Sequence, residues 1–228
     1  MRLSPKHKAY EGTWAQGVLT LVSIVLGVAL SVAAQRIFEI YEAPNKDITF
    51  NIVLQAYALF FIANGTFYHC YTVTSFYHVV PSIFWVTLPI AVGIGVIMTA
   101  YALGNSERFL VATFVFYAAG AACFLFALVE KARSRIGTPL FEIDLEREAL
   151  SLFRNEMLKN LFCFSAMAAC TATIHYFAFV QKLQLPLSVE QYFAIVTTII
   201  YSFMAYWTEY IFLARARTIW SSIDEEVD

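Results

Sequence analysis

Polar side chains recur at helical spacing inside two long apolar segments, and their types suit the handling of a cation. The first set lies in and just after residues 49–71 and consists of Asn64, Tyr68, Tyr71 and His78. The second set lies in residues 190–213 and consists of Thr197, Tyr201, Thr208 and Glu209. Each set falls on one side of a helix. Polar groups on such a face can hydrogen-bond to another helix, or can line a water-filled pathway or a ligand cavity.

Glu209 is the single acid that we place within a membrane-spanning segment, about a turn and a half before Arg215. One interpretation is a carboxylate at the membrane–water interface, either solvated or paired with Arg215 or Arg217. The other is a binding site for a cation or a proton at the cytoplasmic mouth of a pathway.

Cofactor and catalytic motifs are sparse. His69 and His175 lie on different predicted helices and are the minimum set for holding a haem between helices. Packing is the simpler explanation of both, so we expect no cofactor. The four cysteines form no CxxC pair, and we expect no metal site. The chain also contains no HExxH, GxSxG or glycine-rich phosphate-binding motif, so we expect that it is not an enzyme.

Long apolar helices must carry the polar faces, and the distribution of charge indicates where they lie. No Asp, Glu, Lys or Arg occurs between Asp47 and Glu107. A charge at mid-membrane costs roughly 2.5–3.5 kcal/mol, and a helix needs ~20 apolar residues to cross the hydrocarbon core. We therefore predict an all-α, polytopic integral membrane protein, a bundle of about six transmembrane helices. The predicted spans are residues 13–35, 49–71, 81–103, 109–129, 157–180 and 190–213.

Composition supports this fold class. Hydrophobic residues make up 60% of the 228 residues and charged residues 14%, whereas a soluble domain has roughly 45–50% and 25%. Six spans use nearly the whole chain, so we expect a single transmembrane domain over residues 1–228. The net charge of −2 gives no basis for binding nucleic acid. The expected surroundings are the lipid bilayer of a plasma membrane or a bacterial inner membrane.

The basic residues predict the orientation. With both termini in the cytoplasm, four of the 15 Lys and Arg residues fall outside and the other eleven inside. The four outside are Arg36, Lys46, Arg108 and Lys182. Cytoplasmic loops carry an excess of Lys and Arg, so we predict that both termini are cytoplasmic.

Residues 138–156 are predicted to form an amphipathic helix in the cytoplasmic linker before the fifth span. Pro139 suits the first turn of a helix, and Leu145, Leu152 and Met157 share one face. This helix either extends along the membrane surface or the bundle, or provides a docking surface for a cytosolic protein partner. An acidic tail, residues 224–228, ends the chain.

Small residues at four-residue spacing predict the faces through which the helices pack. We single out Ser23, Gly27, Ser31, Gly95, Ala166 and Cys170. Such ridges let helix backbones approach closely. The same contact can join two copies of the chain, so we expect a homo-oligomer.

Together these features predict a homo-oligomeric ion channel or pore-like membrane protein. The alternative is a membrane sensor or anchor. It would signal to a cytosolic partner through residues 130–156 and the acidic tail.

Overall fold

The computed structural model describes residues 5–42, 50–76, 83–133, 143–215 and 218. Within these residues the chain forms six α-helices and two π-helical segments, with no strand, which confirms the all-α prediction. The α-helices are α1 (Pro5–Glu42), α2 (Phe50–Phe76), α3 (Ile83–Tyr101), α4 (Ser106–Arg133), α5 (Ile143–His175) and α6 (Val189–Tyr206). The π-helical segments are η1 (Tyr176–Val180), which continues α5, and η2 (Trp207–Leu213), which continues α6.

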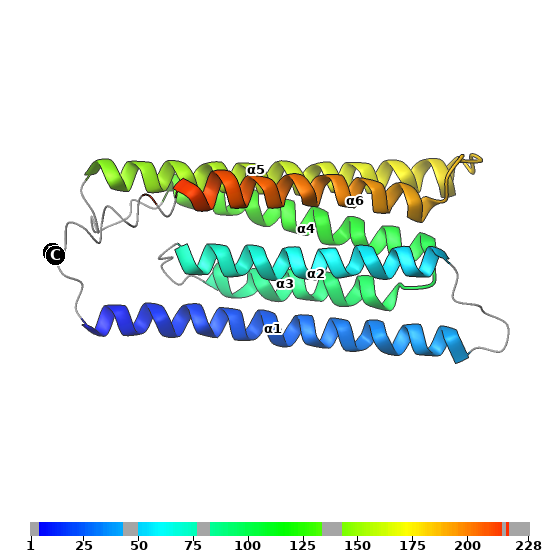
Figure 1. The fold of residues 1–228 in the computed structure, drawn as a ribbon, viewed down its shortest axis with the longest axis horizontal. Helices are drawn as coiled ribbons and strands as arrows, with labels where there is room; N and C mark the ends of the chain where they lie inside the picture. Colours follow the sequence, from blue (N-terminus) through cyan, green and yellow to red (C-terminus); the bar gives the residue numbers. More distant parts are fainter. Residues whose placement is uncertain (1–4, 43–49, 77–82, 134–142, 216–217, 219–228) are drawn as a thin grey trace.

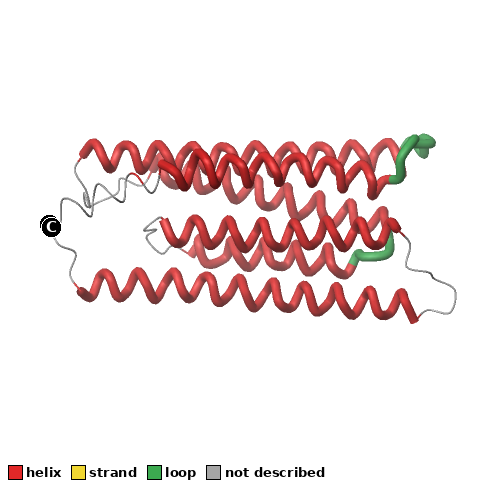
Figure 2. Tube along the Cα trace, viewed as in Figure 1, coloured by secondary structure: helices red, strands yellow, loops and turns green. Residues whose placement is uncertain are grey.

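The helices form an up-and-down bundle in which consecutive helices run in opposite directions (Figure 1). Neighbours around the bundle follow the order α1, α3, α4, α5, α6 and α2, and α2 closes the ring against α1. The described turns, residues 102–105 and 181–188, lie at one end, which we call the loop end (Figure 2). The start of α1 and the end of η2 lie at the opposite end, which we call the tail end.

Four helices in the described part of the chain are long and apolar enough to cross a membrane, as expected of an integral membrane protein. The four segments are Leu19–Glu42, Phe50–Tyr68, Ser106–Phe126 and Arg154–Val180, and α3 contributes a shorter apolar segment, Ile90–Tyr101. The fifth helix joins the predicted linker helix to the predicted span. From Ile143 onward it is continuous, while residues 138–142 lie outside the described part.

Local interactions fix the turn between α3 and α4 at the loop end. Gly104 has a φ of +84°, which favours glycine. Its backbone N–H donates to Gln55 Oε1 of α2 at 2.8 Å. The Asn105 side chain then accepts from the N–H of Arg108 at 2.9 Å and caps the first turn of α4. The turn is thereby tied to α2.

A capping box starts α6. The Ser188 side chain accepts from the N–H of Gln191 at 3.2 Å, and the Gln191 side chain accepts from the N–H of Ser188 at 2.9 Å. This arrangement fixes the first turn of α6, which carries Glu190.

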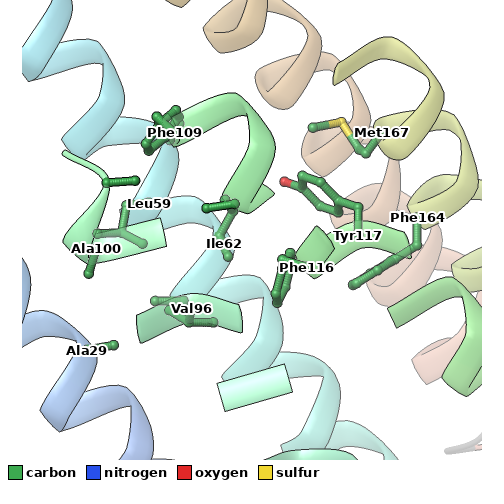
Figure 3. Packing of buried hydrophobic residues seen from close by; sticks show 14 of the residues in the cluster. Ala29, Leu59, Ile62, Val96, Ala100, Phe109, Phe116, Tyr117, Phe164 and Met167 are labelled. Atoms are coloured by element: carbon green, nitrogen blue, oxygen red, sulfur yellow. The ribbon is translucent and has the colours of Figure 1, made fainter. Parts of the chain in front are cut away.

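Aromatic rings fill much of the space between α4, α5 and α6. Phe116, Tyr117 and Phe164 form one group, with the Tyr117 and Phe164 ring centroids 5.6 Å apart (Figure 3). Nearer the loop end, Phe109 of α4 and Phe193 of α6 meet edge to face at 5.5 Å. All five rings are buried, so the interior of the bundle is closely packed.

Gly65 lets α2 approach α6. A Cβ added at this position would overlap the ring of Tyr201. The Tyr201 ring also lies 6.1 Å from that of Phe61 on α2. Because Gly65 has no side chain, the Tyr201 ring can pack directly against the α2 backbone.

The small-residue ridge of α1 lies on the outer surface of the bundle. Ser23, Gly27 and Ser31 are exposed, and each serine donates to a carbonyl of its own helix. A Cβ added at Gly27 would meet no other part of the chain within 4 Å. Contact of this ridge with a second copy remains a prediction. The other predicted packing residues lie deeper: Gly95 is buried beside Phe116, and Ala166 and Cys170 are half-buried.

Candidate functional site: a buried polar face on α6

Three of the four polar residues that the sequence places on the sixth helix are buried: Thr197, Tyr201 and Thr208. Glu190 is buried on the same side of α6, seven residues before Thr197. Steps of seven, four and seven keep these residues close to one line along a helix. We call Glu190, Thr197, Tyr201 and Thr208 the inner face of α6.

At the loop end, Glu190 accepts hydrogen bonds from uncharged side chains. Its Oε1 accepts from Gln55 Nε2 of α2 at 3.1 Å and from the hydroxyl of Ser106 at the start of α4. Only 4% of the Glu190 surface is exposed. No Lys or Arg within the described residues forms an ion pair with it. Its position in the first turn of α6 favours the negative charge through the helix dipole.

At the tail end, α5 contributes a buried ion pair. Lys159 Nζ donates to Glu156 Oε1 at 2.5 Å and to Thr208 Oγ1 of η2 at 3.0 Å. Asn160 Nδ2 also lies 3.4 Å from Glu156 Oε1. The side chains of Lys159 and Glu156 are 3% and 1% exposed. A carboxylate and an ammonium removed from water need each other's charge, so the pair is energetically coupled.

Titratable side chains connect the middle of the bundle to this ion pair. The Tyr117 hydroxyl lies near that of Tyr201. Tyr201 in turn is an electrostatic neighbour of Cys163, and Cys163 of Lys159 and Glu156. These groups extend from α4 through α6 to α5, along the inner face of α6.

Three buried polar atoms along this line lack a hydrogen bond of standard geometry: Tyr117 OH, Glu156 Oε2 and Thr197 Oγ1. Buried polar atoms nearly always have a partner, so each such atom needs an explanation. Thr197 differs from the other buried threonines in this respect. Thr66, Thr99, Thr113 and Thr171 all donate to the carbonyl four residues earlier. Unlike these four threonines, Thr197 on the inner face has a buried hydroxyl without a hydrogen-bond partner.

An apolar step interrupts the inner face between Glu190 and Thr197. The buried Phe109–Phe193 ring pair stands between these two levels of α6. Hydrophobic constrictions of this kind can gate a pathway by excluding water.

The polar residues of α2 face the outside of the bundle. Asn64 is exposed, and its amide donates to the Phe60 carbonyl of its own helix at 2.9 Å. Tyr68 is also exposed, and its hydroxyl donates to Glu209, the exposed acid that follows Thr208. The α2 and α6 faces thus meet at their outer rim. The Tyr71 side chain and His78 lie outside the described residues.

The buried carboxylates are residues that the sequence did not single out. From the sequence we singled out Glu209 as the acid inside a span, but this side chain is exposed. Glu156 and Glu190, the first residue of the predicted span 190–213, are buried. Glu156 also falls at the end of the predicted water-exposed linker. The heptad step from Glu190 to Thr197, and the close spacing of Glu156, Lys159 and Asn160, were the signals available in the sequence.

The histidine pair considered for haem is described only in part. His175 is half-buried, and its Nε2 lies 3.8 Å from Glu107 Oε1. The side chain of His69 lies outside the described part. Among the described residues, no three His, Cys, Asp or Glu side chains gather in a group that could hold a metal ion.

Comparison with known proteins adds no relative: no family model matches this chain, and neither the curated proteins nor the solved structures include a significant match.

Proposed function

We propose that this protein is a channel-like, multi-pass membrane protein that conducts a cation along the inner face of α6. The observation that carries the proposal is the pair of buried carboxylates, Glu190 at the loop end and Glu156 at the tail end. Ionisable groups buried in a membrane protein are costly and mark ion pathways and proton relays. Each acid provides a site at which a cation can enter or leave.

The length of the inner face fits this role. Glu190 and Thr208 are eighteen residues apart, which corresponds to about 27 Å at the rise of an α-helix. This length is close to the ~30 Å thickness of a hydrocarbon core. A cation that passes from the Glu190 cluster to the Glu156 ion pair therefore crosses most of the membrane inside one copy of the chain. Homo-oligomerisation through the exposed ridge of α1 is a separate part of the proposal.

Six spans and two cytoplasmic termini complete the proposed topology, with the loop end outside. A membrane-impermeant maleimide should label Gln184→Cys in intact cells, because Gln184 is exposed at the loop end. Ser222→Cys should react only after permeabilisation. The parent chain, with its four native cysteines, measures the background. Labelling of Ser222→Cys alone in intact cells would mean that the orientation is reversed.

A second candidate function is the relay of a signal from a cytosolic partner. The observation that favours it is the continuity of α5, which runs without a break from Ile143 to the buried Glu156–Lys159 pair and beyond. A partner bound to the linker before α5 could shift this helix and with it the ion pair. In this case the protein conducts no ion by itself.

Flux measurements on the purified full-length protein separate the two functions. In liposomes with an inside–outside cation gradient and an imposed voltage, we expect a cation flux above that of protein-free liposomes. Cation flux should depend on the amount of protein incorporated. If liposomes that contain correctly folded protein pass cations no faster than protein-free liposomes, conduction is excluded and the signalling function remains.

A further inference from the structure

The chemistry of the inner face identifies the conducted ion, an inference that rests on the proposed function. The described groups on the inner face and beside it on α5 are two carboxylates, tyrosine and threonine hydroxyls, a thiol and a lysine ammonium. Such groups accept and release protons or pass them along hydrogen bonds. A metal cation needs oxygen ligands that replace its water shell and, in addition, enough room to pass.

The packing of the interior also selects against a hydrated metal ion. The buried rings of Phe109 and Phe193 meet between the levels of Glu190 and Thr197. The buried rings of Phe116, Tyr117 and Phe164 pack against one another (Figure 3). Close-packed rings leave little room for an ion with its water shell. A proton needs only hydrogen-bonded groups or transient single waters.

Lys159 supplies the counter-charge of Glu156 at the tail end. Its ammonium is buried and reaches across from α5 to Thr208 on the inner face. The same ammonium stabilises Glu156 as a carboxylate between successive protons.

The geometry of Glu156 leaves one acceptor position for a proton. Lys159 Nζ and Asn160 Nδ2 both lie against Oε1, while Oε2 is buried without a hydrogen-bond partner. Among the described residues, the titratable groups around it are Lys159 and Cys163 on α5. Tyr201 of α6 and Tyr117 of α4 follow beyond Cys163. Thr208 contributes a hydroxyl that bonds to Lys159.

We infer that the conducted ion is the proton, and that Glu156 Oε2 is its binding site at the tail end. A proton arriving along the inner face forms an O–H bond with Oε2, which makes the carboxyl group neutral beside the Lys159 ammonium. That bond breaks when the proton passes to water at the tail end, and the carboxylate pairs with Lys159 again.

Liposomes that contain a pH-sensitive dye and a potassium gradient test this inference, with valinomycin setting the voltage. The parent protein should admit protons in response to the voltage. Parallel assays with radioactive sodium and rubidium should show no uptake above that of protein-free liposomes. Glu156→Gln should reduce the proton flux to the protein-free level. Glu39→Gln is the matched control, because Glu39 is an exposed acid on α1, and it should conduct like the parent.

Tyr201→Phe is a second variant for the case in which Glu156→Gln folds poorly. It removes only a hydroxyl and keeps the ring against Gly65, and it should lower the proton flux without loss of folded protein. Sodium or rubidium flux without proton flux would overturn the inference while supporting the proposed function. Proton flux at the parent rate in both Glu156→Gln and Tyr201→Phe would overturn it as well. Absence of flux for every ion would instead exclude the proposed function itself.

Discussion

Replacing Lys159 with methionine should lower the free energy of unfolding by about 3–5 kcal/mol, because it leaves a buried carboxylate without its counter-charge. Lys159 and Glu156 are almost fully buried, and the ammonium also bonds to Thr208 of the next helix. Titration of the detergent-solubilised protein with SDS, followed by circular dichroism, measures the loss. The double variant Lys159→Met with Glu156→Gln should recover most of the stability, since it removes both charges.

The pair formed by Arg36 and Glu39 provides a matched control. It has the same i,i+3 spacing and the same 2.5 Å N–O distance, but its side chains are 37% and 44% exposed. Arg36→Met should therefore cost less than about 1 kcal/mol. Equal losses for Lys159→Met and Arg36→Met would contradict the burial of the α5 ion pair.

The helical content of the fold was predictable because one strong physical signal controls it. Long segments without charge, such as the one between Asp47 and Glu107, occur only where water is excluded, and four described helices have the expected length and apolar composition. Helix ends were less predictable. α1 extends from Pro5 to Glu42, well beyond residues 13–35, because a helix can continue into water past the apolar part that predicts a span.

The direction of the polar faces could not be deduced from spacing. Periodicity shows that Asn64 and Tyr68 share a side of α2, but not whether that side faces the bundle. Asn64 satisfies its amide with a carbonyl of its own helix, so it requires no partner from another helix. Serines 23 and 31 do the same on α1. A polar residue that bonds to a carbonyl of its own helix does not have to face the interior of the bundle.

The buried acids depend on contacts between residues far apart in the sequence. Glu190 is covered by Gln55 and Ser106, which come from α2 and α4. Lys159, the ion-pair partner of Glu156, also bonds to Thr208 of η2. Neither contact can be inferred from the spacing within one helix.

Substitution of Thr197 on α6 should slow conduction, whereas substitution of its neighbour Thr198 should not. Thr197 is fully buried, and its hydroxyl has no hydrogen-bond partner. Thr198 is exposed, donates to the Ala194 carbonyl at 2.8 Å and lies 3.3 Å from the Tyr57 hydroxyl. Valine has nearly the shape of threonine and lacks only the hydroxyl. Because the Thr197 hydroxyl makes no bond, Thr197→Val should not reduce the stability of the folded protein.

The most direct measurement is therefore the liposome flux of Thr197→Val and Thr198→Val beside the parent, with equal amounts of folded protein incorporated. If a cation follows the inner face of α6, Thr197→Val should conduct far more slowly than the parent and Thr198→Val at the parent rate. Equal flux through both variants, or loss of flux in Thr198→Val alone, would show that the ion does not pass along the inner face.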